Sequence, residues 1–273
     1  MKFKMLICKV CKSSNLVKKF EYFKRPHDET IYAGINYGKY HRIYYKCLKC
    51  GHYSGYFKMK INNLYSSTYN DATYSGKIKK NFDKINNLPS SKSDNYYRVE
   101  RIDNFLKKNF FKKSKKMKIL DVGSGLGIFP FKMSKKKYDV TALDPDRRSC
   151  LHLKKNLKIK ALHGDFLKIK IKKKFQLVTL NKVIEHVEDT INFVNKAKKI
   201  LKPGGFIYIE VPDAQGAAKH GKYREEFFID HLHVFSKKSL NYLAKQLRLK
   251  IKHMDAIREP SSKFSIFAFL EKK

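Results

Sequence analysis

The fold is decided by the stretch Asp121-Val122-Gly123-Ser124-Gly125-Leu126-Gly127, whose pattern is D-x-G-x-G-x-G. The residues just before it, 117–120, are typical of a short buried strand. Glycine accepts the backbone dihedrals and the close approach of a ligand that a strand-to-helix turn of this kind requires. The stretch therefore predicts an α/β domain in which this loop holds an adenosine-type ligand.

The spacing of the glycines separates two classes of cofactor. A nicotinamide fingerprint, G-x-G-x-x-G, would place its third glycine at position 128, but that residue is Ile128. The spacing therefore disfavours NAD. With an aspartate two residues before the first glycine, the stretch resembles the first motif of class I methyltransferases that use S-adenosylmethionine (SAM). This resemblance implies a Rossmann-like methyltransferase sheet and cofactor contacts from Asp121, Gly123, Ser124, Gly125 and Gly127.

Three later segments fit the same resemblance in family order. The apolar run 140–143 ends in Asp144, where a doubly wound sheet places the carboxylate that accepts hydrogen bonds from ribose hydroxyls. The resemblance implies adenine contacts for Asp165 and Phe166. After a further predicted strand at 177–180, it implies that Asn181 lines the cofactor cleft.

The segment after that strand reads Asn181-Lys182-Val183-Ile184-Glu185-His186 and matches the family's post-strand motif. We expect Glu185 and His186 to be structural. A helix is predicted at 190–201 because apolar residues recur on one stripe, and Lys202-Pro203-Gly204-Gly205 cannot continue it. A fifth strand is predicted at 206–211.

Two CxxC pairs mark the amino-terminal part of the chain. The two-residue gap lets both thiolates of a pair reach one tetrahedral Zn²⁺, so we predict a structural zinc ribbon held by Cys8, Cys11, Cys47 and Cys50. The loop between the pairs is longer than the usual length of about 15 to 20 residues. Two disulfides are the rival interpretation, and redox use of one pair is disfavoured because neither opens a βαβ unit.

The chain length of 273 residues fits one α/β domain and a smaller appendage. We predict a zinc ribbon at 1–62, a connector and lead-in helix at 63–112, and a SAM-dependent domain at 113–273. The connector part, 63–93, shows little periodicity, whereas a helix is predicted from Asp94 onward. No apolar run is long enough for a membrane span. Met5-Leu6-Ile7 is too short for a signal peptide, so we expect a cytoplasmic protein.

The net charge of +37 raises the question of a nucleic-acid partner. The excess is mostly lysine spread along the whole chain, whereas phosphate and base recognition favour the planar fork of arginine. The residues after the fourth strand also lack the N-P-P-[YF] or Pro-Cys motif that methyltransferases acting on adenine or cytosine rings carry there. Nucleic acid is therefore a disfavoured partner that the sequence leaves open.

The carboxyl-terminal third holds the predicted chemistry. Ser236 is expected to cap a helix, and Asp230, His231 and His233 come just before it, beyond the sheet edge, where an acceptor would lie. Methyl transfer is an in-line displacement that requires removal of a proton from the acceptor, and histidine has an ordinary pKa suited to that step. These three residues are the candidate catalytic residues.

Together, the paired cysteines, the SAM motifs and this acidic-His element resemble the zinc-containing sugar methyltransferases, including C-methyltransferases that act on nucleotide-linked keto-sugars. In that family an E-H pair serves as the base, so the resemblance implies that His231 accepts the proton with Asp230 beside it. The chain departs from the family in having Asp in place of Glu and a second histidine at 233. The target atom therefore stays open.

The sequence thus predicts SAM-dependent methyl transfer, at carbon or oxygen, to a small molecule such as a sugar, a nucleotide-sugar or a glycan precursor. Two alternatives remain. One is an RNA or DNA methyltransferase that grips the polymer with its zinc ribbon and basic surface, and the other is a noncatalytic SAM-fold binding module.

Overall fold

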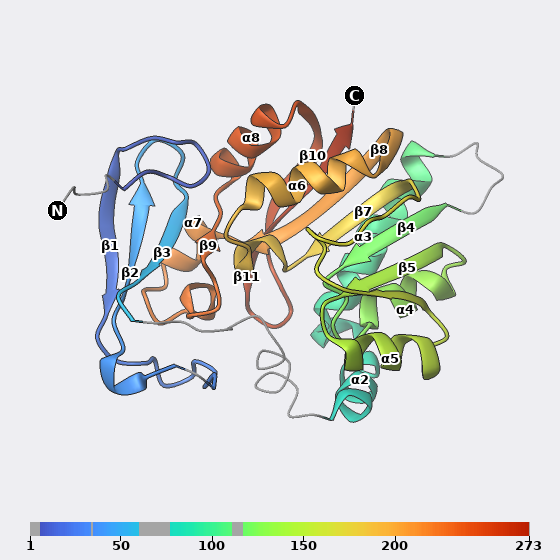
Figure 1. The fold of residues 1–273 in the computed structure, drawn as a ribbon, viewed down its shortest axis with the longest axis horizontal. Helices are drawn as coiled ribbons and strands as arrows, with labels where there is room; N and C mark the ends of the chain where they lie inside the picture. Colours follow the sequence, from blue (N-terminus) through green and yellow to red (C-terminus); the bar gives the residue numbers. More distant parts are fainter. Residues whose placement is uncertain (1–5, 34, 60–76, 111–116, 273) are drawn as a thin grey trace.

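The computed structural model describes residues 6–33, 35–59, 77–110 and 117–272 (Figure 1). Its centre is a seven-stranded sheet in the order β10-β11-β8-β7-β4-β5-β6. The strands are β4 (Lys118–Val122), β5 (Asp139–Asp144), β6 (Lys160–His163), β7 (Phe175–Asn181), β8 (Leu201–Pro212), β10 (Leu249–Arg258) and β11 (Phe264–Lys272). Strands β4 to β8 are parallel, and β11 lies antiparallel between β8 and β10.

The strand order creates a switch point beside β4. The chain runs outward from β4 to β5 and β6, and then returns to place β7 on the other side of β4. In open α/β sheets, ligands bind in the crevice outside the carboxyl ends of the strands at such a point. The glycine turn follows β4 directly, so it opens into this crevice.

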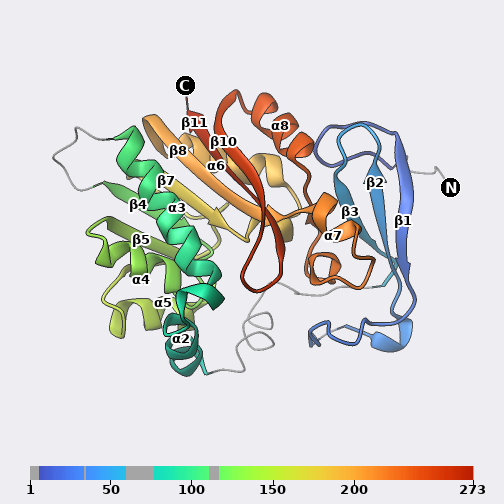
Figure 2. The ribbon, with the colours of Figure 1, turned by 180° about the vertical axis from the view of Figure 1, so that it is seen from behind.

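Helices cover both faces of the sheet (Figures 1 and 2). Apolar residues of α3 and α4 form one cluster with β4, β8 and β11, while α6 and α8 share another cluster with β7 and β8. The helix α5 packs its buried cysteine and leucine over β5 and β6. The helices are α2 (Ile78–Asn86), α3 (Asp94–Asn109), α4 (Ile128–Lys135), α5 (Arg147–Lys155), α6 (Thr190–Lys199), α7 (Ala214–Ala218) and α8 (Lys237–Gln246).

Local signals explain several of these elements. Strand β7 is buried over nearly its whole length, as expected for a parallel strand covered on both faces. Ser236 caps α8 through a reciprocal capping box with Ser239, which confirms the predicted cap. Helix α3 begins after Ser93, whose side chain accepts a hydrogen bond from Tyr96 N. The helix buries Val99, Ile102 and Leu106.

A second, four-stranded sheet stands at the amino-terminal end, on the left in Figure 1. It contains β1 (Leu16–Tyr22), β2 (Arg42–Cys47), β3 (Tyr53–Phe57) and β9 (His233–Val234). Strand β9 belongs to the carboxyl-terminal third of the chain and pairs antiparallel with β3. We call residues 6–33 and 35–59 the amino-terminal module. Its sheet is completed by a strand about 180 residues further along the chain.

The structure extends the predicted elements in three places. Helix α6 ends at Lys199 and strand β8 begins at Leu201, five residues before the predicted start of that strand. The residues Lys202-Pro203-Gly204-Gly205 lie at a shift in its register with β7. The connector contains the helix α2, which packs Phe82 against the residues that follow the glycine turn. Strands β10 and β11 add an antiparallel edge that periodicity did not predict.

The predicted domain boundaries at 62 and 112 fall among residues outside the described ranges, as does the first half of the connector. Within the ranges that are described, every helix is too short or too polar to cross a bilayer.

Candidate active site

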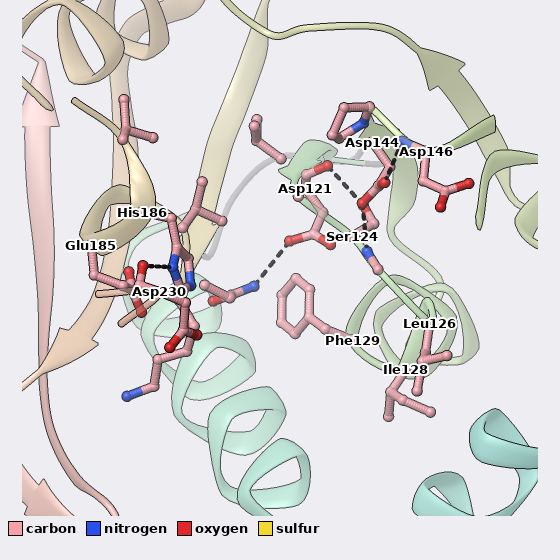
Figure 3. Close-up of a pocket in the computed structure, with 18 of the residues that line it drawn as sticks. Asp121, Ser124, Leu126, Ile128, Phe129, Asp144, Asp146, Glu185, His186 and Asp230 are labelled. Carbon is pink, nitrogen blue, oxygen red and sulfur yellow. Dashed lines mark hydrogen bonds between the residues drawn. The ribbon is translucent and has the colours of Figure 1, made fainter. Parts of the chain in front are cut away.

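A cavity of about 1260 Å³ opens at the carboxyl ends of β4, β5 and β7 (Figure 3). Its walls include the glycine turn, the first turns of α3, the ends of β5, β6 and β7, the segment 225–231, the start of β11, and the amino-terminal module through Asp28, Thr30 and Tyr32. Figure 3 shows Asp144 and Asp146 on one side of this cavity and Glu185, His186 and Asp230 grouped on the other. We call these the loop side and the acceptor side.

The glycine turn has no room for side chains. Gly123 and Gly127 have φ angles of +71° and +84°, in the left-handed region. A Cβ at Gly123 would lie 2.7 Å from a methyl of Val183, and one at Gly127 would lie 2.6 Å from a methyl of Leu153. The turn therefore requires glycine for both its dihedrals and its packing.

Asp121 lies buried at the end of β4. Its Oδ1 accepts hydrogen bonds from Thr179 Oγ1 at 2.6 Å and from Asn181 Nδ2 at 2.9 Å. Burial raises the pKa of Asp121 to about 6. The structure thus brings two of the predicted cofactor residues, Asp121 and Asn181, into direct contact.

Asp144 ties the end of β5 to the glycine turn. Its Oδ2 accepts a hydrogen bond from Gly125 N at 2.8 Å, and its Oδ1 accepts one from Asp146 N at 2.9 Å. Burial raises the pKa of Asp144 to about 6. Each carboxylate oxygen has a second lone pair, so the group can still accept hydrogen bonds from the hydroxyl groups of a ligand.

Asp165 and Phe166 line the same cavity after β6. About half of the Asp165 side chain is exposed, and its Oδ1 accepts a hydrogen bond from Leu167 N at 2.8 Å. Phe166 is buried against Phe193. All the residues predicted to bind the cofactor therefore border one cavity.

The acceptor side contains two neighbouring imidazoles whose planes are tilted by 40° to one another. The rings of His186 and His231 lie 5.1 Å apart. His231 Nδ1 is 3.0 Å from Glu226 O, and His186 Nδ1 is 2.7 Å from Asp230 O. Because a carbonyl oxygen only accepts, each Nδ1 is the donor, which leaves the lone pair of His231 on Nε2.

Two carboxylates flank these rings. Asp230 Oδ2 is 3.9 Å from His231 Nε2. Glu185 is fully buried, and neither of its carboxylate oxygens has a hydrogen-bond partner among the described residues. Burial raises the pKa of Glu185. A buried carboxyl group without a partner is costly, so its presence in a cavity wall indicates a functional position.

Glu185 and His186, which we expected to be structural, both line the cavity, so the geometry adds them to the candidate site residues. Their position in the sequence could have indicated this, because they follow the carboxyl end of β7, beside the switch point of the sheet.

His233 was predicted to be catalytic, but the structure places it outside the cavity. It lies in β9, outside the cavity wall, with Nδ1 2.9 Å from Nε2 of His52 and both rings fully buried. Burial lowers the pKa of His233 to about 3, so the ring is neutral. His231 precedes β9 and lines the cavity, whereas His233 is buried against His52, so we leave His233 out of the candidate catalytic set.

The four cysteines of the CxxC pairs meet in the amino-terminal module. All four are buried, and their sulfur atoms lie within 4.8 Å of one another. Cys8 Sγ is 3.6 Å from Cys50 Sγ, and Cys11 Sγ is 3.5 Å from Cys47 Sγ. Both distances are too long for a disulfide, whose S–S bond is about 2.05 Å, and each of these cysteines is free.

The sulfur arrangement suits a four-coordinate metal. A tetrahedron with metal–sulfur distances of about 2.3 Å has sulfur atoms about 3.8 Å apart, close to the separations observed. On the acceptor side, Glu185, His186 and His231 also bring one ligand-type atom each within 4.8 Å of one another.

A comparison with known proteins identifies the family to which the chain is similar. A family model described as "Methyltransferase domain" matches residues 95–253. The ubiquinone biosynthesis O-methyltransferase of Pelagibacter ubique is 30% identical over 119 residues, which cover 42% of this chain and 50% of that protein. The protein of the same name from Rickettsia typhi is 31% identical over 120 residues, covering 42% and 48%. The chain thus spans about half the length of the curated relatives it matches.

Solved structures share the fold. The plantazolicin methyltransferase BpumL superimposes with a TM-score of 0.58 at 16% identity, covering 75% of this chain and 95% of that one. Magnesium protoporphyrin IX methyltransferase from Synechocystis gives a TM-score of 0.57 at 10% identity, covering 74% and 97%. At these identities the similarity extends to the fold alone, which confirms the predicted Rossmann-like α/β class.

Proposed function

The chain belongs to the methyltransferase-domain family, and from this membership we propose that it transfers a methyl group from SAM to a small-molecule acceptor. The observation that carries the proposal is a single cavity that joins the glycine turn and Asp144 to His231 and Glu185. Its volume of about 1260 Å³ exceeds the range of about 300 to 1000 Å³ that is usual for one ligand. Cofactor and acceptor therefore have room side by side.

The loop side fits SAM by its chemistry. Asp144 would accept the ribose hydroxyls, while Asp165 and Phe166 would meet the adenine. Asp121 adds a carboxylate near the glycine turn, and SAM carries positive charge on its sulfonium and ammonium groups. Gly123 and Gly127 allow the ligand to approach the backbone closely. SAM would supply an electrophilic methyl group.

On the acceptor side we assign the proton transfer to His231. The hydrogen bond from Nδ1 to Glu226 O leaves the Nε2 lone pair to accept a proton. As the acceptor atom bonds to the methyl carbon, its proton passes to Nε2, and the electrons of the breaking carbon–sulfur bond stay on sulfur. Asp230, 3.9 Å from Nε2, stabilises the imidazolium that results.

The charge of the cavity bears on the acceptor class. Among the described residues, ten acidic and five basic side chains line it, although the chain as a whole has 61 basic and 24 acidic residues. The basic excess therefore avoids the cavity. Like charges close together cost free energy, so we propose a neutral or cationic acceptor that carries no phosphate.

This charge pattern disfavours two of the earlier possibilities. A nucleic acid would bring several phosphates to an acidic wall, and a nucleotide-linked sugar would bring two. A phosphate-free hydroxyl compound, a sugar among them, remains compatible. The sugar-linked acceptor stays a prediction, since none of the relatives and structures named above bears such a name. The relatives named as O-methyltransferases favour transfer to oxygen.

We also propose that the four cysteines hold one structural zinc ion. Four buried thiols with sulfur separations near those of a tetrahedron support this assignment. Four thiolates fill the coordination sphere, so the ion would stabilise the module and take no part in catalysis.

Isothermal titration calorimetry with SAM, S-adenosylhomocysteine and NAD tests the cofactor assignment. We expect binding of the first two and no heat with NAD. Binding of NAD without any response to SAM would exclude the proposed function.

A further inference from the structure

We infer that the amino-terminal module forms part of the active site, with Tyr44 as a positioning residue for His231. The inference rests on the proposed function, because His231 is the proton acceptor proposed there. In this inference the module supports catalysis and does not serve to bind nucleic acid. The module holds the backbone of the segment 226–232, which carries Asp230 and His231.

This segment has little secondary structure of its own. The 3-10 turn η4 (Glu225–Phe227) covers only the first two residues of the segment, and β9 starts only at His233. Backbone groups in such a segment need partners elsewhere. Several of them bind the amino-terminal module: Gly55 N donates to Leu232 O at 2.9 Å, and Ile229 N donates to Glu29 Oε1 at 2.7 Å.

Tyr44 makes the contact nearest the proposed base. Its side chain is fully buried between the two parts of the chain. Its hydroxyl lies within hydrogen-bonding distance of the carbonyl oxygens of His231 and of Phe228, the latter at 3.0 Å. One end of His231 is therefore fixed by Tyr44 and the other by the bond from Nδ1 to Glu226 O.

A buried ion pair anchors the same segment. Arg42 and Glu29 are each about 98% buried or more, with Nη2 and Oε1 2.7 Å apart. Arg42 also donates to Phe227 O, and Glu29 accepts from Tyr40 at 2.5 Å. A buried charge is tolerated only when it is paired and hydrogen-bonded. The docked segment supplies a further hydrogen-bond partner to each member of this pair, Phe227 O to Arg42 and Ile229 N to Glu29.

The module also contributes side chains to the cavity itself. Asp28, Thr30 and Tyr32 line its wall. The pKa of Tyr32 is raised first by burial and then by the nearby carboxylate of Asp230. The module thus reaches the acceptor side by two routes, through the backbone at His231 and through the side chain at Asp230.

The test compares Tyr44→Phe with Tyr45→Phe. Tyr45 is the next residue of β2, and its ring packs on Tyr56 instead, so the control makes the same chemical change on the other face of the strand. A shift of about 1 Å at a catalytic group costs about 10²-fold in rate. For Tyr44→Phe we expect kcat to fall about 10- to 100-fold, the pH–rate profile to change, and the KM and Kd for SAM to stay within about twofold.

Hydrogen exchange followed by mass spectrometry gives a readout that needs no acceptor. Tyr44→Phe should speed exchange in 226–232 and leave β4, β5 and β7 as protected as in the wild type. Tyr45→Phe should change neither region. If the wild type transfers no methyl group, the proposed function fails, but the exchange experiment still judges the docking.

Three results would overturn the inference. The first is unchanged exchange in 226–232. The second is faster exchange there with unaltered kcat and pH profile in an active enzyme. The third is a parallel loss of SAM affinity and sheet protection, which would mean that Tyr44 acts on the stability of the whole protein.

Discussion

Asp144 offers the sharpest perturbation of the loop side. Asp144→Asn keeps the volume of the side chain but replaces one carboxylate oxygen with an NH₂ group. In the wild type, both oxygens accept backbone N–H groups, from Gly125 at 2.8 Å and from Asp146 at 2.9 Å. The NH₂ group of asparagine would face one of these two backbone N–H groups, and two donors cannot bond to each other. The substitution therefore weakens the glycine turn, and it also removes a charged acceptor for the ribose.

The magnitude follows from the hydrogen bonds that are lost. A hydrogen bond to a charged group contributes about 1.5 to 3 kcal/mol. Two ribose hydroxyls bound to a carboxylate would then account for about 3 to 6 kcal/mol, which is an affinity loss of about 10²- to 10⁴-fold for SAM. The control is Asp139→Asn at the other end of β5, where the carboxylate pairs with Lys160 at 2.7 Å.

Calorimetric titration with SAM measures both variants. We expect Asp144→Asn to lose affinity by the amount above and Asp139→Asn to bind within about threefold of the wild type. An Asp144→Asn variant with near-normal affinity, or an equal loss in both variants, would refute the assignment of Asp144 to the ribose.

The pH dependence carries a second expectation. Burial raises the pKa of Asp144 and of Asp121 to about 6. Both groups therefore take up protons as the pH falls through about 6 and lose the charge that favours SAM. Affinity should fall by about tenfold per carboxylate between pH 7.5 and pH 5, and Asp144→Asn should remove one of the two steps. A flat affinity over this range would contradict the expectation.

Three further predictions concern the turn, the metal and the base. Gly123→Ala should lower the melting temperature by a few degrees and weaken SAM binding, because its Cβ would lie 2.7 Å from a valine methyl. The control is Gly204→Ala, which is also at positive φ but in open space, and it should affect SAM binding little. Elemental analysis should find one zinc per chain, lost in Cys47→Ser, and less than about half an equivalent in the wild type would reject the metal assignment. His231→Ala should cut turnover by about 10²- to 10⁴-fold at near-normal SAM affinity, whereas His253→Ala on the exposed face of β10 should not.

The loop side was predictable because its determinants are local. The pattern from Asp121 to Gly127 encodes a turn that only glycine can adopt, and the observed angles and close contacts confirm that requirement. Asp144 was predictable from its place after a strand in the same unit. Such signals need only the chain order of a few residues and the regular geometry of a parallel sheet.

The acceptor side depends on contacts that are distant in sequence. Nothing near His233 indicates that it pairs with Ser54 of the amino-terminal module, so its burial against His52 could not be predicted. Tyr44 was one of many tyrosines in the sequence, and only the docking of 226–232 distinguishes it. Within the described part of the chain, no hydrogen bond to its carboxylate distinguishes Glu185. Burial of such groups is decided by tertiary packing.

The central claim is tested most directly by following the methyl group of radiolabelled SAM in a cell extract separated into small-molecule and nucleic-acid fractions. We expect the wild type to transfer label into the small-molecule fraction and His231→Ala to transfer less than about one hundredth as much. Label in RNA or DNA, or equal transfer by both proteins, would contradict the account.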